Sequence, residues 1–167
     1  HLILESMSEM IKELPNIHLI IAGSGEYEES LKFKVKNLKL NERVTFIPWL
    51  DKDSLRELLS ATDVFVYPSI SFGGWEEQFG YSMAEASLME VPIISTRTGS
   101  VEEVVINNET GLLINPDNVN QLAMAMLKLG DDKELRNKMG KAGRKFIEDN
   151  FSYQIIVKKF YEFFKSL

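Results

Sequence analysis

The chain has 167 residues and a net charge of −6, and hydrophobic and charged side chains make up 44% and 26% of it. This length and composition predict a single globular domain around one core, and the acidic balance argues against a nucleic-acid partner. The absence of cysteine excludes a disulfide framework and thiolate metal sites, and it agrees with a cytoplasmic location.

The expected elements alternate between helix and strand. A first helix is expected over residues 1–14, where apolar residues recur near helical spacing without a preceding cap, as in a chain cut from a longer protein. A β-branched run over 17–22 then enters the turn Gly23-Ser24-Gly25, the pattern of a buried parallel strand. Further strands are expected over 43–47, 63–67, 92–96 and 112–115, and further helices over 27–38, 52–60, 80–89, 101–106, 118–129, 133–149 and 153–165.

Five short apolar strands separated by helices predict an α/β fold, a Rossmann-like parallel sheet with helices on both faces. In such open sheets, ligands bind beyond the carboxyl ends of the strands, where loops and helix amino termini converge. A site is therefore expected among the loops at 22–26, 48–51, 68–80 and 96–102.

The third of these loops carries residues that a purely structural segment rarely needs. It combines a glycine pair, a tryptophan, two acidic residues and a Phe-Gly step that opens a helix: Gly73-Gly74, Trp75, Glu76-Glu77 and Phe79-Gly80. Backbone N–H groups at a helix amino terminus suit an anion or a hydroxyl ligand. Glu77 and Glu85 stand eight positions apart, the first just before the expected helix and the second inside it, so they are separated by roughly 10 Å along the helix axis. Their carboxylates can accept hydrogen bonds from the vicinal hydroxyls of a ribose or a hexose.

These motifs resemble those of the retaining glycosyltransferases of family four. The family signature is two glutamates separated by seven residues, with Phe-Gly after the first and Glu-Ala around the second, here Glu77, Phe79-Gly80 and Glu85-Ala86. Flanking segments match in the same order: Ala22–Gly25, Arg43–Phe46, Ala61–Ser69, Val91–Ile94 and Glu109–Ile114. The resemblance covers nearly the whole chain. It implies one half of the two-domain B fold, the carboxy-terminal nucleotide-sugar-binding domain, over residues 1–167.

The resemblance also implies the roles of individual residues. Glu77 is expected to bind hydroxyls of the donor sugar as a positioning group rather than a nucleophile, and Glu85 to hold the ribose. The backbone amides of Gln78, Phe79, Gly80 and Tyr81 would also bind the sugar. The nucleobase would lie near Trp49, which could stack on it, and Leu50. The turn at Gly23 and Gly25 would border the same ligand. The expected donor is a UDP-sugar or a GDP-sugar, and no metal or other cofactor is expected.

Two family features are not matched. Gly99-Ser100-Val101-Glu102-Glu103 stands where the family has Gly-Gly-x-Pro-Glu. The Arg and Lys that neutralise the diphosphate in the family would precede residue 1, as would the amino-terminal acceptor domain. We therefore expect a hexosyltransferase fragment that is inactive alone and contributes no identified catalytic residue. The aromatic segment 151–167 is expected to pack on the missing domain.

For the full-length parent, the resemblance implies transfer to a saccharide or lipid-linked acceptor in polysaccharide or glycoconjugate biosynthesis. The expected location is the cytoplasm, with peripheral association at the inner face of the membrane left open. The main alternative is a non-catalytic Rossmann-like nucleotide-binding module. A nicotinamide-dependent oxidoreductase is disfavoured because Glu26-Tyr27-Glu28 follows the Gly23–Gly25 turn where a third glycine would be needed.

Overall fold

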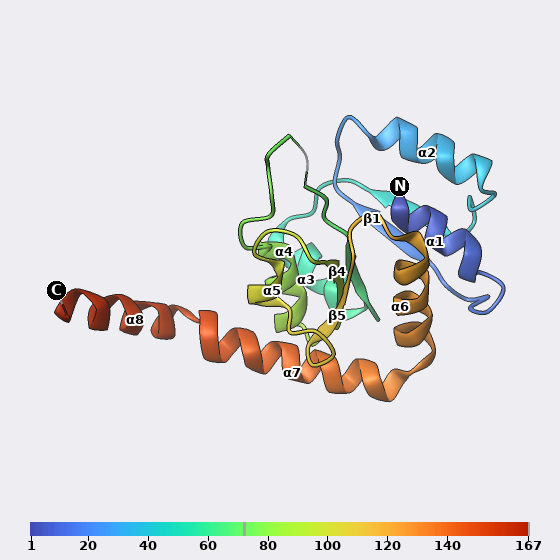
Figure 1. Cartoon of the computed structure of the whole chain (residues 1–167). Coiled ribbons are helices and arrows are strands. Elements are labelled where there is room, and N and C mark those ends of the chain that lie inside the picture. Colours follow the sequence, from blue (N-terminus) through green and yellow to red (C-terminus); the bar gives the residue numbers. More distant parts are fainter. Residues whose placement is uncertain (72, 167) are drawn as a thin grey trace.

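The computed structural model describes residues 1–71 and 73–166, and helices alternate with strands along them (Figure 1). The strands are β1 (Leu19–Ala22), β2 (Val44–Ile47), β3 (Phe65–Tyr67), β4 (Ile93–Thr96) and β5 (Gly111–Ile114). The helices are α1 (Leu2–Met10), α2 (Glu28–Asn37), α3 (Lys52–Ser60), α4 (Tyr81–Leu88), α5 (Val101–Val104), α6 (Val119–Asp131), α7 (Lys133–Phe151) and α8 (Tyr153–Lys165). Among these, none is both long and apolar enough to span a membrane.

Several expected helix ends are wrong by two to four residues, at α1, α5, α6 and α7. Helix α1 ends at Met10 rather than at residue 14, because the N–H groups of Glu13 and Leu14 both donate to the Met10 carbonyl in a turn ahead of Pro15. Helix α8 spans the expected residues 153–165, whereas α7 continues two residues beyond the expected end at 149, to Phe151, before Ser152 takes an extended backbone.

All strand pairs are parallel, which confirms the expected α/β class, but the strands form two sheets rather than one. Strand β1 pairs with β2, with Leu19 opposite Val44. Strand β4 lies between β3 and β5, so that Ile93 is opposite both Phe65 and Gly111. In the part of the chain that the structure describes, no strand pairing joins β1 to β3.

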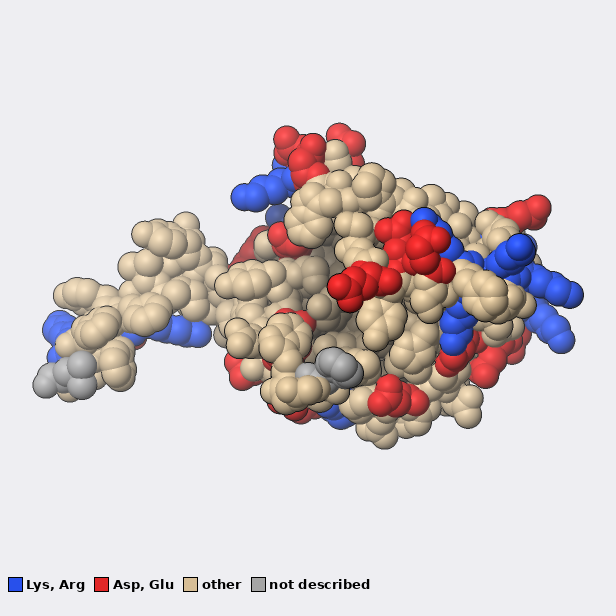
Figure 2. All heavy atoms as spheres, turned by 90° about the horizontal axis from the view of Figure 1, so that it is seen from above, with Lys and Arg blue, Asp and Glu red and all other residues tan. Residues whose placement is uncertain are grey.

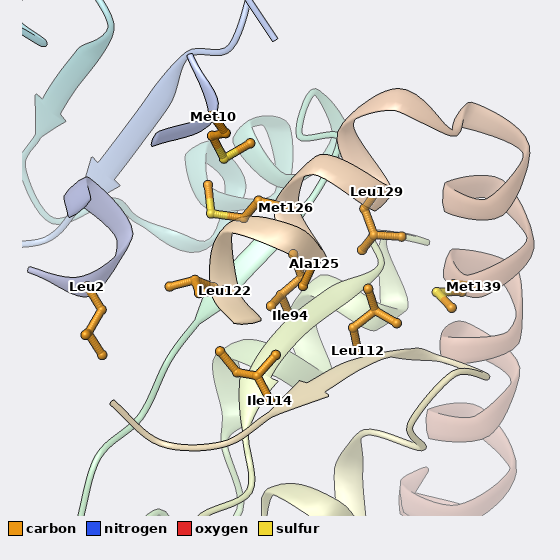
Figure 3. Packing of buried hydrophobic residues seen from close by; sticks show 10 residues of the cluster. All are labelled: Leu2, Met10, Ile94, Leu112, Ile114, Leu122, Ala125, Met126, Leu129 and Met139. Carbon is orange, nitrogen blue, oxygen red and sulfur yellow. The ribbon is translucent and has the colours of Figure 1, made fainter. Parts of the chain in front are cut away.

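Helix α1 contributes to the core beside both sheets. Its Leu4 and Met7 pack in the cluster around β1 and β2, together with Val44. Its Leu2 and Met10 belong to a second cluster with side chains of α6, β4, β5 and α7 (Figure 3): Leu122, Ala125, Met126, Leu129, Ile94, Leu112, Ile114 and Met139. Burying each large apolar side chain contributes about 1.5–3 kcal/mol. Both clusters therefore depend on α1.

Helix α7 packs on α4 and on the turn after it through Gly140 and Gly143. The two glycines differ in how close a neighbouring atom would lie to an added Cβ. A Cβ atom on Gly140 would lie 1.8 Å from the carbonyl oxygen of Glu90, whereas one on Gly143 would lie 3.4 Å from the Ser87 hydroxyl. The first distance requires the backbone to move, and the second is an ordinary contact. The close approach of these segments therefore depends on Gly140.

Replacing Gly140 by Ala is expected to lower the free energy of unfolding by about 1–3 kcal/mol, because the added methyl group pushes α7 away from Glu90. The matched change Gly143→Ala is expected to leave that free energy within about 1 kcal/mol, because alanine also favours the helix. Urea unfolding followed by circular dichroism measures both. Equal losses in the two variants would contradict this account of the packing.

Candidate functional site

The candidate site lies at the sheet edge where the parallel strands end. Residues 68–80 join β3 to α4 and form the longest loop at that edge. Figure 1 shows this loop, in green, projecting beyond the strands. Its glycines Gly73 and Gly74 have φ values of +58° and +79°, a conformation that favours glycine and here forms an open turn.

The carboxylate of Glu77 is held from both of its oxygens. The Gly80 N–H donates to Oε1 at 2.9 Å, and the Tyr67 hydroxyl donates to Oε2 at 3.0 Å. Burial raises the pKa of the Tyr67 phenol above its ordinary value, and the hydrogen bond to Glu77 raises it further. Each carboxylate oxygen still has a lone pair available. The half-buried Glu77 side chain can therefore accept hydrogen bonds from a ligand in a fixed orientation.

The Phe-Gly step after Glu77 has a separate structural reason for each residue. Gly80 precedes α4 with a φ of +74°, and a Cβ there would lie 2.1 Å from the end of the buried Met83 side chain. Phe79 packs edge-on against Phe151 of α7 and against Tyr81, with ring centroids 5.1 Å apart in both pairs. The step therefore fixes where α4 begins relative to Glu77.

The loop after β4 is locked to the backbone of Glu77. The Ser100 N–H donates to the Glu77 carbonyl at 2.9 Å, and Gly99 lies so close that an added Cβ would be 2.2 Å from the same oxygen. The buried hydroxyls of Ser95 and Thr96 donate to the carbonyls of Tyr67 and Ser69 at the start of the site loop. These contacts connect two loops that are distant in sequence.

Sequence reasoning placed the 96–102 loop near the site but gave no individual role to Tyr67, Gly99 or Ser100. It treated Tyr67 as one residue of a matching segment and Gly99-Ser100 as a departure from a motif. A signal for Tyr67 was present, because a phenol at the last residue of a strand lies at the ligand-binding edge. Gly99 has no comparable signal, since its close approach to Glu77 depends on how the two loops fold.

The other expected residues of this loop and helix are more exposed. Gln78, Tyr81 and Glu85 are all exposed, and Glu85 lies on the fifth residue of α4. Within the described residues, the Glu85 carboxylate makes no hydrogen bond or ion pair, so it is an available acceptor one helical turn beyond the amino terminus of α4.

The remaining expected residues lie at the ends of β1 and β2. Gly23 follows β1 with a φ of +115°, and its N–H donates to the Ile47 carbonyl at 3.0 Å. Gly25 has open space around it, Leu50 is half-buried, and the Trp49 side chain is 84% exposed. Across the described residues, no hydrogen bond or aromatic contact joins this group to Glu77 or Glu85.

The face that Figure 2 looks down on carries groups of Asp and Glu side chains near its middle, among mostly uncharged residues. Lys and Arg side chains are visible mainly toward its edges. Arg97 follows β4 at this sheet edge, but its guanidinium is paired with Glu102. No group of three metal-ligating side chains occurs among residues 1–71 and 73–166. The described polar groups at the site are therefore mainly carboxylates, hydroxyls and backbone amides.

The fold and this edge define a Rossmann-like α/β domain with its candidate site at the carboxyl ends of parallel strands. The chain belongs to the group 1 glycosyltransferases, because the family model described as "Glycosyl transferases group 1" matches residues 1–146. This confirms the family resemblance found in the sequence.

Two curated relatives illustrate the breadth of the family. The GDP-mannose-dependent monoacylated alpha-(1-6)-phosphatidylinositol monomannoside mannosyltransferase of Corynebacterium glutamicum is 31% identical over 156 residues, which cover 92% of this chain and 40% of the relative. The capsular polysaccharide biosynthesis glycosyltransferase CapM of Staphylococcus aureus is also 31% identical, over 93% of this chain and 40% of its own length. The chain thus spans about 40% of the length of these relatives.

Solved structures agree on the fold. Sucrose-phosphate synthase from Thermosynechococcus elongatus superposes with a TM-score of 0.81 at 27% identity, over 98% of this chain and 41% of that one. Anabaena HepE, solved in complex with UDP and glucose, has a TM-score of 0.87 at 21% identity, over 100% of this chain and 44% of that one. The carboxy-terminal domain of LpcC from Francisella tularensis has a TM-score of 0.78 at 24% sequence identity, over 92% of this chain and 79% of that domain. The fold corresponds to one half of a two-domain glycosyltransferase.

Replacing Tyr67 by Phe removes one hydrogen bond to Glu77 and is expected to lower the free energy of unfolding by about 1 kcal/mol at neutral pH. Because the pKa of Tyr67 is raised in the folded chain, this stabilisation is present below the ordinary tyrosine pKa of about 10. It is lost as the pH rises through the folded-state value. Urea unfolding of both proteins from neutral to strongly alkaline pH tests this, and a difference that grows with pH would contradict it.

Proposed function

We propose that this chain is the donor-binding domain of a retaining glycosyltransferase and that it binds a UDP-sugar or a GDP-sugar. The observation that carries the proposal is the Glu77 carboxylate, held by Gly80 and Tyr67 at the amino terminus of α4 with the unpaired Glu85 eight positions further on. The names of the relatives support a nucleotide sugar, since one depends on GDP-mannose and a structural neighbour was solved with UDP.

In this proposal the two glutamates divide the donor between them. The held carboxylate of Glu77 accepts hydrogen bonds from sugar hydroxyls, and the backbone N–H groups of residues 78–81 help to bind the same sugar. The exposed carboxylate of Glu85 accepts two hydrogen bonds from the ribose diol. The base lies beside Trp49 and Leu50, and the Gly23–Gly25 turn borders the same ligand.

Positioning is the chemical contribution proposed for this domain. Breaking the anomeric C–O bond develops positive charge on the sugar and negative charge on the leaving diphosphate. The fixed carboxylate holds the sugar so that the acceptor hydroxyl approaches the anomeric carbon from the face that the diphosphate leaves. The C–O bond to the diphosphate breaks, the bond to the acceptor oxygen forms, and the leaving diphosphate takes the hydroxyl proton, so configuration is retained without a covalent bond to the enzyme. Donor binding through carboxylates and backbone amides requires no metal, so binding is expected to persist in EDTA.

We propose hexosyl transfer by the full-length protein to a saccharide or lipid-linked acceptor, as the names of the mannosyltransferase and capsular relatives suggest. The acceptor would be bound by an amino-terminal domain outside this chain, so the chain alone would not complete the reaction. A cytoplasmic location, with peripheral contact at the inner membrane face, would fit acceptors of this kind.

Calorimetric titration of the chain with UDP, GDP and ADP tests the donor site. One nucleotide is expected to bind, and Glu85→Ala is expected to weaken that binding about tenfold or more, because the ribose hydroxyls lose a charged acceptor. The matched variant Glu134→Ala, at an exposed position in the first turn of α7, is expected to bind as the unmodified chain does.

Two outcomes contradict parts of this proposal. Unchanged binding in Glu85→Ala would remove the ribose role of that carboxylate. Failure of all three nucleotides to bind at millimolar concentration would reject donor binding by this chain.

Helix α8 is proposed to pack on the amino-terminal acceptor domain. None of its residues is buried, and it extends away from the rest of the chain beyond α7 (Figure 1). Its exposed apolar side chains are Tyr153, Val157, Phe160, Tyr161, Phe163 and Phe164. Such a concentration of exposed aromatic rings is typical of a surface that contacts another protein unit.

Removing residues 153–167 is expected to change the free energy of unfolding by less than about 1 kcal/mol, because little apolar surface is lost from the core. Phe151 must be kept, since it packs against Phe79 and Phe146. Thermal and urea unfolding of the shortened chain measure the effect. A large loss of stability would show that α8 is part of this domain's core and would contradict the proposed contact.

A further inference from the structure

Exposed aromatic side chains gather at the carboxyl ends of the strands. Apart from α8, the exposed aromatic residues of the described chain are Tyr27, Phe33, Trp49, Trp75 and Tyr81. Four of these lie in segments that follow strands, and only Phe33 lies within α2. Because parallel strands all end at one edge, the four rings lie on the side of the sheets that carries the candidate site.

Trp75 has a defined place in this set. It directly follows the Gly73-Gly74 turn, and its side chain is 62% exposed. The neighbouring Glu76 is turned toward the other arm of the loop, where it accepts a hydrogen bond from the Ser71 hydroxyl at 3.1 Å. The indole therefore presents a large apolar surface to solvent from a loop whose end is held in place.

The held end of the loop is Glu77, two residues along the chain from Trp75. Trp75 lies in a β-bridge, and residues 76 and 77 have no regular structure. Side chains two positions apart in extended backbone lie on the same side. Glu76, between them, points to Ser71, whereas Glu77 bonds to Tyr67 and Gly80. The different directions of Glu76 and Glu77 are those of an alternating segment, which would place the Trp75 ring on the same side of the loop as the Glu77 carboxylate.

A hexose matches this pair of groups. One face of a pyranose ring exposes C–H groups that pack on a flat aromatic surface, and its hydroxyls project from the rim toward hydrogen-bond acceptors. A phosphate would be repelled by Glu77, and the hydroxyl-rich rim of a hexose offers this carboxylate more donors than the N–H groups of uracil or guanine do. The local chemistry therefore suits the sugar end of the donor better than its nucleotide end.

We propose that Trp75 is a specificity-determining residue that packs on the apolar face of the donor hexose while Glu77 accepts its hydroxyls. This inference rests on the proposed donor-binding function. In this proposal the donor sugar binds at residues 73–77, and the nucleobase binds at the loop that contains Trp49.

The test compares nucleotide with nucleotide sugar by calorimetry, using UDP and UDP-glucose and, in parallel, GDP and GDP-mannose. Trp75→Ala is expected to weaken binding of the nucleotide sugar about three- to tenfold and to leave binding of the nucleotide unchanged. Trp75→Phe keeps an aromatic face and is expected to recover most of the affinity. The matched control Phe33→Ala removes an equally exposed ring from α2 and should alter neither affinity.

A second readout follows the indole itself. Binding of the nucleotide sugar is expected to change tryptophan fluorescence more in the unmodified chain than in Trp75→Phe. Equal weakening of nucleotide and nucleotide sugar in Trp75→Ala would place the ring elsewhere on the donor and overturn the inference, as would no change in either. Failure of every nucleotide to bind would instead reject the donor-binding function on which the inference rests.

Discussion

Helix α1 is the constraint on which the arrangement of the site depends. It contributes Leu4 and Met7 to the cluster around β1 and β2, and Leu2 and Met10 to the cluster beside β4 and β5. Its buried Ser6 hydroxyl also donates to the Val119 carbonyl at 3.0 Å, where α6 begins. Because no strand pairing links the two sheets in the described chain, this packing sets the position of the Trp49 loop relative to the Glu77 loop.

The site itself combines a rigid part with open groups. Buried hydroxyls of β4 fix the start of the loop after β3, and the Gly99-Ser100 backbone fixes its end at Glu77. Beyond these anchors, the described residues Gly73, Gly74 and Trp75 extend into solvent. A fixed carboxylate beside an open loop can accept hydrogen bonds from ligands that share hydroxyl positions but differ in shape.

Much of the fold could be predicted from local patterns, because short β-branched runs such as Ile93–Thr96 specify buried strands wherever they pair. The division into two sheets could not be predicted, since apolar runs identify strands but not the neighbours that they contact. The Phe-Gly step and the two glutamates could be recognised as a motif in the sequence. In the structure, Phe79 packs against Phe151, and a side chain on Gly80 would collide with Met83. The Tyr67–Glu77 hydrogen bond and the Gly99 contact arise only when separate loops meet, so spacing alone carries no sign of them.

The division of the sheet leaves backbone groups at two strand edges without strand partners in the described chain. Strand β1 uses one edge for β2 and β3 uses one for β4, and their side chains are half-buried or exposed, whereas those of β4 and β5 are buried. Ile20 of β1 is 43% exposed. The side chains of β1 and β3 are therefore packed less completely than those of β4 and β5, so the junction between the two sheets is the part of the sheet layer that opens most readily.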